Sequence, residues 1–149
     1  MNPRIDDWSG KRVWLLGASS GIGAALGRAL LARDACVALS ARNAARLLEV
    51  AAGEQQALVL PCDAADEASL RTAWEALLAA WGGVDVALYV AGDYLPMRAW
   101  ELDVAKARHM IAVNFGGAVS FAACVVPQLL RQGNGQIGFV ASVAGYRGL

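Results

Sequence analysis

Short runs of apolar residues alternate along the chain with longer segments in which apolar residues recur at helical spacing. The apolar runs lie at residues 12–16, 35–40, 57–62, 85–91 and 136–141, and the helical patterns lie at 22–33, 43–52, 66–81 and 103–131. Asp66 is a candidate N-cap, and Gly82-Gly83 is a candidate helix stop. Because strands and helices alternate strictly with short connections, the pattern predicts an α/β fold: a three-layer, doubly wound parallel sheet with strand order 3-2-1-4-5.

Composition and charge narrow the class of protein. The chain has 149 residues, 57% of them hydrophobic and only 17% charged, which fits one domain over residues 1–149 with strands buried on both faces. The formal net charge is zero and no basic stripe is present, so we expect no nucleic-acid partner. The N-terminus has no signal-peptide core, and Cys36, Cys62 and Cys124 suggest buried thiols in a reducing compartment, so we expect a cytoplasmic protein.

One segment raises the question of a membrane. Residues 111–130 are nearly free of charge over the length of a bilayer span. The segment is interrupted by Asn114, Ser120, Pro127 and Gln128. We therefore favour a buried helix and expect no membrane association, with a membrane span as the alternative.

A glycine-rich turn follows the first apolar run and precedes the first helical pattern. Its candidate ligand-binding residues are Gly17, Ser19, Ser20, Gly21, Ile22 and Gly23. Glycines let the backbone turn tightly and approach a phosphate, and the first N–H groups of the helix are free to bind an anion. The context predicts a dinucleotide site; the alternative is a tight turn used only for packing.

The second predicted strand ends beside a basic residue. A cofactor-selecting side chain is expected roughly 20 residues past the glycine turn, where an acid favours NAD. This chain has Ala41 and Arg42 there, and a guanidinium can bind the 2′-phosphate of NADP. We therefore favour NADP over NAD. In the alternative interpretation, Arg42 only solvates a loop beside Arg46.

The glycine spacing Gly-x3-Gly-x-Gly and the order of the later motifs resemble the short-chain dehydrogenase/reductase family, whose domain is a Rossmann fold. By this resemblance, Asp63 contacts the adenine amino group, with a helix-capping role as the alternative. Ala91 and Gly92 match the end of the family's Asn-Asn-Ala-Gly motif and allow close approach to a cofactor. Both asparagines are replaced, by Tyr89 and Val90, which puts their bracing hydrogen bonds in doubt.

Two further matches concern catalysis. Asn114 and Gly116-Gly117 are poor choices inside a helix, and the resemblance makes the Asn114 backbone carbonyl the holder of a proton-relay water. The alternative is close packing at the two glycines. Ser142 follows the fifth predicted strand and matches the family's catalytic serine, which hydrogen-bonds the substrate oxygen. The alternative is that the Ser142 hydroxyl only hydrogen-bonds the backbone of a loop at the end of the strand.

The family's proton donor is a tyrosine followed, after three residues, by a lysine, and the printed sequence lacks this pair. Tyr146 lies only four residues after Ser142, and the only lysines are Lys11 and Lys106. His109 is more simply read as a solvated side chain. We therefore expect a truncated oxidoreductase portion that is inactive alone. The alternatives are a natural short protein that binds a nucleotide or a protein partner without catalysis, and a structural dimer without a ligand.

The apolar surface left by this organisation predicts a homodimer. The contact would use the helix at 103–131, the edge strand at 136–141, or both. The helix carries an apolar stripe composed of Ala107, Ile111, Ala118, Phe121, Ala122 and Val125.

Overall fold

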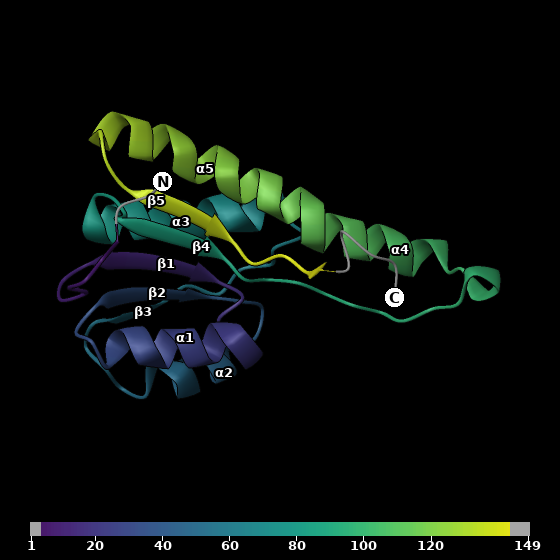
Figure 1. Cartoon of the computed structure of the whole chain (residues 1–149), viewed down its shortest axis with the longest axis horizontal. Coiled ribbons are helices and arrows are strands. Elements are labelled where there is room, and N and C mark those ends of the chain that lie inside the picture. The colour runs from purple at the N-terminus through teal and green to yellow at the C-terminus, as the bar shows by residue number, and fades with distance from the viewer. Residues whose placement is uncertain (1–3, 144–149) are drawn as a thin grey trace.

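The computed structural model describes residues 4–143 and contains one five-stranded parallel sheet (Figure 1). The strands are β1 (Arg12–Leu16), β2 (Cys36–Ser40), β3 (Ala57–Val59), β4 (Val86–Tyr89) and β5 (Gln136–Phe139). Their order in the sheet is β3-β2-β1-β4-β5, and each neighbouring pair is parallel. The predicted fold class and strand order are confirmed.

Three strands end earlier than their apolar runs. β3 stops at Val59, β4 at Tyr89 and β5 at Phe139. Hydrogen bonds to the neighbouring strand continue past these points, since Leu60 N–H donates to the Leu39 carbonyl at 3.0 Å and Val140 N–H donates to the Tyr89 carbonyl at 2.9 Å. Apolar side chains still pack against the sheet after regular pairing ends, so an apolar run overestimates strand length.

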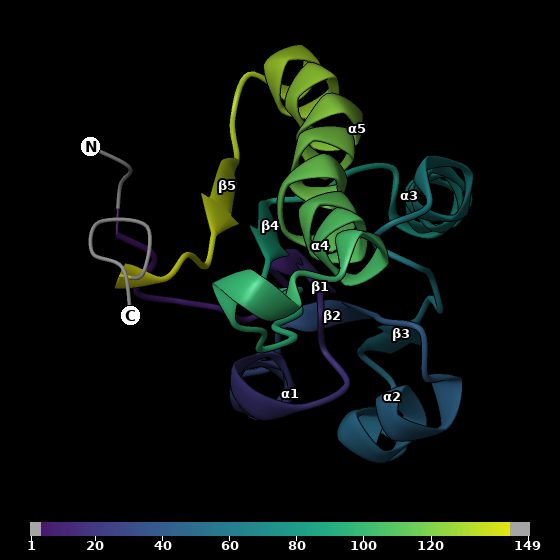
Figure 2. The same ribbon diagram turned by 90° about the vertical axis from the view of Figure 1, so that its right-hand side faces the viewer.

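Helices cover both faces of the sheet, as Figure 2 shows. α1 (Gly21–Leu31) and α2 (Ala44–Ala51) lie on one face, and α3 (Glu67–Trp81) and α5 (Gly117–Gln132) lie on the other. The predicted ends of α3 are confirmed: the Asp66 carboxylate accepts hydrogen bonds from Ala68 and Ser69 N–H, and Gly82 ends the helix at a φ of 69°.

Alternate residues of β1 serve the two halves of the core. Val13 and Leu15 pack with α1 and α2, whereas Trp14 and Leu16 pack with α3 and α5. Trp14 is fully buried between Trp74 and Phe121, with ring centroids 5.2 and 4.6 Å away. Its indole N–H donates to the Ser40 hydroxyl at 2.9 Å, so the largest core side chain also has its polar atom satisfied.

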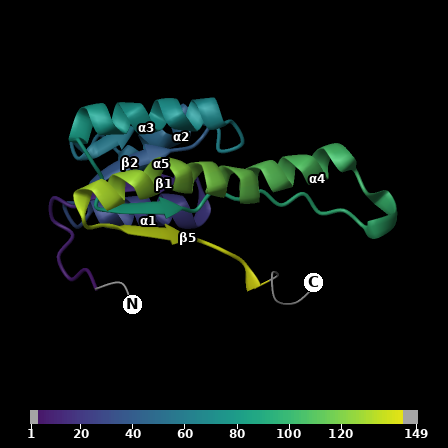
Figure 3. The same ribbon diagram turned by 90° about the horizontal axis from the view of Figure 1, so that it is seen from above.

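The helical pattern predicted at 103–131 is one helical segment, Val104–Gln132, with an irregular turn inside it. α4 (Val104–Ile111) leads into a π-helical turn at Ala112–Gly116, and α5 follows directly. α4 and the segment before it project beyond the sheet (Figures 1 and 3). The residues that are poor helix formers thus mark a real local irregularity.

The apolar stripe predicted as a surface of this helix is wrong at two of its members. Phe121 and Val125 are fully buried against the sheet of the same chain. Of the predicted stripe, Ile111 is exposed, and the other exposed apolar side chains of the segment include Phe115 and Val119, which the stripe did not contain. Sequence periodicity identifies an apolar face but does not say whether the chain's own sheet or a partner covers it.

The segment Val104–Gln132 is long and apolar enough to cross a membrane by length and composition, and 22% of its most apolar window is buried. Core helices of globular proteins pass the same criterion. Phe121 and Val125 pack on the sheet, so the C-terminal half of the segment contributes one face to the core. That the protein has no membrane association stays a prediction.

Candidate functional site

A cleft of about 560 Å³ opens where the strands end at their carboxyl edge. Its lining includes the last residue of β1 and residues from the segments that follow each of the five strands. The lining residues are Leu16, Gly17, Ser19, Ser20, Ile22, Gly23, Ala41, Arg42, Asn43, Arg46, Cys62, Asp63, Ala64, Val90, Ala91, Gly92, Asp93, Val113 and Val140. This is the place where doubly wound sheets bind ligands.

The glycine turn after β1 shapes the floor of the cleft. Gly17 has a φ of 98°, and its N–H donates to the Ser40 carbonyl at 2.7 Å. A methyl group at Gly17 would overlap the Ala91 backbone, and one at Gly23 would overlap the Gly17 carbonyl. Gly17 and Gly23 are therefore required by close backbone approach, whereas Gly21 has open space and a φ of 52°.

The N-terminus of α1 differs from those of the other helices that follow a loop. Asn43, Asp66 and Asp103 cap α2, α3 and α4 with side-chain oxygens. At α1, the Ser20 side chain makes no capping bond, and no acidic residue lies in the first turn. Ser19, Ser20, Ile22 and Gly23 line the cleft, so these unsatisfied N–H groups lie beside it and suit an anion.

Two arginines that follow β2 contribute to the lining of the cleft. Arg42 and Arg46 both line it, and both are exposed. Within residues 4–143, neither guanidinium has a hydrogen-bond or ion-pair acceptor, unlike that of Arg12, which binds Asp85. Asn43, between them, caps α2 by accepting from Arg46 N–H at 3.1 Å. Two unpaired cations in a concave site provide a potential phosphate contact.

Asp63 lies in the cleft, half-buried, on the loop between β3 and α3. Its carboxylate accepts from Ala65 N–H at 2.9 Å, which closes a local turn, and Asp66 takes the helix-capping position. The neighbouring Cys62 is buried, and burial raises the pKa of its thiol to about 11. Cys62 is therefore a neutral wall of the cleft at physiological pH.

Ala91, Gly92 and Asp93 form the wall that follows β4. Asn114, in the π-helical turn, binds this wall from the side: its amide N–H donates to the Asp93 carbonyl, and its amide oxygen accepts from Asp93 N–H, both at 2.8 Å. Asn114 itself is exposed and is not among the residues that line the cleft in the described part of the chain.

Tyr89 has a role that sequence reasoning missed. It stands in place of the first asparagine of the family motif, and its hydroxyl donates to the Val113 carbonyl in the π-helical turn. Burial, followed by the nearby Cys62 and Asp63, raises the pKa of Tyr89 to about 12. Two features of the sequence could have indicated this role: a tyrosine replaces the asparagine, and Gly117 has no side chain. The Tyr89 hydroxyl occupies the space beside Gly117.

The remaining candidates lie at or beyond the rim. Ser142 is exposed and follows Val140, the last cleft-lining residue of the described chain. Tyr146 lies outside the described residues. His109 is not simply solvated, because its Nε2 is 3.0 Å from an oxygen of Asp93. This contact links α4 to the cleft wall and gives His109 a structural partner.

Comparison with known proteins matches the whole described fold. A sequence profile of the family described as short chain dehydrogenase matches residues 11–149. Dehydrogenase/reductase SDR family member 7 of Mus musculus is 32% identical over 156 residues, which cover 93% of this chain and 46% of the relative. An uncharacterized oxidoreductase of Staphylococcus epidermidis is 32% identical over 131 residues, covering 87% of this chain and 57% of the relative. The chain thus spans about half the length of the curated relatives it matches.

Solved structures agree with these sequence matches. A short-chain type dehydrogenase/reductase from Mycobacterium marinum superposes with a TM-score of 0.89 at 29% identity, over 96% of this chain and 60% of that one. L-sorbose reductase from Gluconobacter frateurii, solved with NADPH and L-sorbose, gives a TM-score of 0.88 at 27% identity, over 96% of this chain and 56% of that one.

Proposed function

The chain belongs to the short-chain dehydrogenase/reductase family, and we propose that its cleft binds NADP(H). Membership in this family implies a nicotinamide dinucleotide cofactor. The observation that carries the proposal is the N-terminus of α1, which lies uncapped beside the cleft and follows a turn in which Gly21 has open space around it. In this proposal the pyrophosphate lies at Ser19, Ser20, Gly21 and Ile22, Asp63 takes the adenine amino group, and Ala91 and Gly92 face the nicotinamide half.

The preference for NADP over NAD rests on Arg42. The end of β2 has no carboxylate to bind a ribose diol, whereas Arg42 and Arg46 leave two guanidinium groups unpaired in the cleft. A 2′-phosphate would give Arg42 a charge-assisted contact that NAD cannot make. The sorbose reductase that superposes on this chain was solved with NADPH, which supports the same choice by similarity.

Calorimetric titration of the 149-residue chain with NADP and with NAD tests the site and its selectivity. A charge-assisted contact is worth roughly 1.5–3 kcal/mol, so we expect NADP to bind about ten-fold or more tightly than NAD. Arg42→Ala should bring the two affinities together. Arg28→Ala is the matched control, because Arg28 is exposed on α1 and lies outside the cleft lining. Equal wild-type affinities would contradict the NADP preference, and no binding would contradict the site itself.

For the whole protein, we propose hydride transfer between NADP(H) and an alcohol or carbonyl substrate. Ser142 would hydrogen-bond the substrate oxygen and Asn114 would support the proton relay. The family's proton donor is a tyrosine followed, after three residues, by a lysine. The printed sequence contains no such pair, so it lacks this general acid. When NADPH and a panel of ketones and aldehydes are added to the 149-residue chain, we therefore expect no robust oxidation of NADPH. Turnover that Ser142→Ala abolishes would contradict this expectation.

We also propose that this chain forms a homodimer. The exposed side chains of Phe115 (69%) on the helix and Phe139 (48%) on β5 give two apolar surfaces. Phe115→Asp should disrupt a contact through the helix. Phe139→Pro should disrupt pairing at the open edge, because the N–H groups of Gln136 and Val140 bind β4 and that of Phe139 faces away. Phe139→Ala is its control, and a monodisperse monomer in sedimentation at micromolar concentration would contradict the dimer.

We place the protein in a reducing, cytoplasmic compartment. Cys36, Cys62 and Cys124 are all free, which supports this assignment.

A further inference from the structure

The Tyr89 side chain joins parts of the chain that are distant in sequence. Tyr89 is the last residue of β4 and only 2% exposed. Its ring packs on Phe121 and Phe139, with centroids 5.5 and 6.2 Å away, and its hydroxyl donates to the Val113 carbonyl. Since its pKa is raised to about 12 by burial, the hydroxyl stays protonated at physiological pH and remains a donor.

The surroundings fit this hydroxyl closely. A methyl group added to Gly117 would overlap both the Tyr89 hydroxyl and the Ala64 carbonyl. The hydroxyl therefore lies where β4, the loop between β3 and α3, and the helical segment meet. Ala64 and Val113 each line the cleft, so the junction supports two of its walls.

The π-helical turn links this junction to a third wall. Val113 and Asn114 are adjacent in the turn, and Asn114 makes its two 2.8 Å hydrogen bonds with the Asp93 backbone. Asp93 is four residues beyond Tyr89 in the chain. The polypeptide thus closes a ring: Tyr89 binds the turn through Val113, and the turn returns through Asn114 to the wall that follows β4.

We propose that Tyr89 is a positioning residue for the cleft, whose hydroxyl fixes the π-helical turn and thereby holds Asn114 on the Asp93 backbone. The wall at Ala91, Gly92 and Asp93 then keeps the shape that a bound dinucleotide meets. The effect on the cofactor rests on the proposed function, whereas the coupling between Tyr89 and Asp93 does not. A phenylalanine would fill the same space, so the hydroxyl alone carries the inference.

The test uses Tyr89→Phe in the 149-residue chain, with Tyr94→Phe as the matched control because Tyr94 lies on the following segment and is 77% exposed. The first measurement is amide hydrogen exchange at Asp93, whose N–H is bound by Asn114. We expect Tyr89→Phe to speed this exchange roughly three- to ten-fold, the range set by one hydrogen bond. Asn114→Ala should do the same, and the double variant should add little, since both act on one linkage.

The second measurement is NADPH affinity, which a purely structural role would leave unchanged in the folded variant. We expect Tyr89→Phe to weaken NADPH binding roughly three- to ten-fold and Tyr94→Phe to leave it unchanged. If Tyr89→Phe lowers the melting temperature but alters neither Asp93 exchange nor affinity, the residue only packs the core and the proposal is overturned. Faster exchange with unchanged affinity also overturns it, because the cleft would not depend on the linkage.

A third measurement uses the wild-type chain, so it does not depend on whether Tyr89→Phe folds. A hydroxyl proton donated to a buried carbonyl should appear as a slowly exchanging resonance with contacts to the amide protons of the π-helical turn, and Asn114→Ala should shift it. Absence of that resonance would overturn the proposal. If wild-type chain binds no NADPH, the proposed function fails, while Asp93 exchange still decides whether Tyr89 holds the turn.

Discussion

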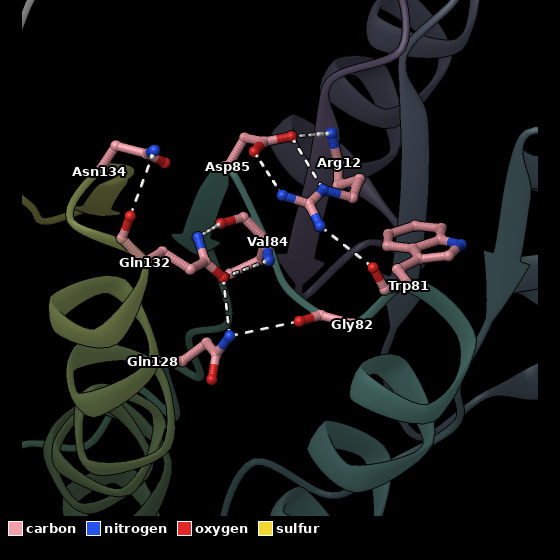
Figure 4. Close-up of polar contacts among 8 residues, drawn as sticks. All are labelled: Arg12, Trp81, Gly82, Val84, Asp85, Gln128, Gln132 and Asn134. Atoms are coloured by element: carbon pink, nitrogen blue, oxygen red, sulfur yellow. Dashed lines mark hydrogen bonds and ion pairs between the residues drawn. The ribbon is translucent and has the colours of Figure 1, made fainter.

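The two edges of the sheet are built in opposite ways. At the amino edge, where the strands begin, side chains join the elements (Figure 4). The Arg12 guanidinium donates to the Asp85 carboxylate at 2.7 and 3.1 Å, and its third nitrogen donates to the Trp81 carbonyl at 3.1 Å. Arg12 N–H also donates to Asp85 at 2.8 Å. One carboxylate thus connects the starts of β1 and β4, and Arg12 extends the link to the end of α3.

Glutamines from α5 complete this edge. The Gln132 amide binds both backbone groups of Val84, donating to the carbonyl at 2.8 Å and accepting from the N–H at 3.2 Å. Gln128 donates to Gln132 at 2.9 Å and to the Gly82 carbonyl at 3.3 Å. The last turn of α5 is therefore bound to the segment that enters β4, as the close-up in Figure 4 shows.

At the carboxyl edge, the part of the cleft beside α1 is formed by backbone groups that no side chain caps. Gly17 and Gly23 have no Cβ where neighbouring backbone lies close, α1 begins without a side-chain cap, and the Arg42 side chain has no acceptor in the described residues. Unsatisfied donors reduce stability but prepare a site for an anion. At the glycine turn, added atoms should therefore be harmful, whereas at the Arg12–Asp85 contact the removal of atoms should be harmful.

The largest effect should come from adding one methyl group, in Gly17→Ala. The residue must keep a φ of 98° and would overlap the Ala91 backbone. Strain and overpacking together predict a loss of at least about 3 kcal/mol in the free energy of unfolding, measured with urea, and loss of NADP binding.

Gly53→Ala is the control for Gly17→Ala. Gly53 has a φ of 80°, but a methyl group there meets nothing within 4 Å. It should cost only about 1 kcal/mol, from the backbone conformation alone, with NADP affinity unchanged. Equal destabilisation by the two substitutions would show that backbone overlap at Gly17 is unimportant.

An intermediate effect should follow from removing the acceptor at the amino edge, in Asp85→Ala. The variant loses three hydrogen bonds from Arg12 and leaves a partly buried guanidinium unpaired, so we expect a loss of about 2–3 kcal/mol in urea unfolding. NADP affinity of the folded variant should not change, because Asp85 lies outside the cleft lining.

Glu67→Ala is the matched control for Asp85→Ala, since it breaks the exposed ion pair with Arg71. That pair should contribute at most about 1 kcal/mol. If Glu67→Ala and Asp85→Ala destabilise equally, the partly buried network is no stronger than a surface ion pair and the contrast between the two edges fails.

The sequence predicted the carboxyl edge better than the amino edge for a physical reason. The glycine turn is a local motif, and parallel strands necessarily bring their ends together, so Gly17, Arg42, Asp63 and Ala91 could be assigned to one cleft in advance. Arg12, Asp85 and Gln132 are far apart in sequence and of common surface types. Only the register of β1 against β4 and the end point of α5 bring them together.

The same limit applies inside the site. Asn114 stood out because it breaks helix propensity, and it does lie in a π-helical turn. Tyr89 breaks no local rule, since an aromatic residue suits a buried strand. Its hydrogen bond with the Val113 carbonyl depends on the helix crossing β4 at Gly117. The position of this crossing is set by tertiary packing, which the spacing of apolar residues does not predict.

The smallest effect concerns pH at the amino edge. Hydrogen bonds from the Arg12 side chain lower the pKa of Asp85, and partial burial only opposes this. Because the folded pKa lies below the unfolded value, the stabilisation is complete above about pH 4 and is lost as the pH falls through the folded pKa. Asp85→Asn does not titrate at this position, so the stability difference between wild type and variant should shrink on acidification.

Urea unfolding of the wild type and of Asp85→Asn from pH 6 to pH 3 measures that difference directly. Other carboxylates titrate in both proteins, so their contributions cancel in the comparison. The change should be on the order of 1 kcal/mol, since the group is only partly buried. A difference that stays constant across this range would show that the Asp85 charge adds nothing beyond hydrogen-bond geometry.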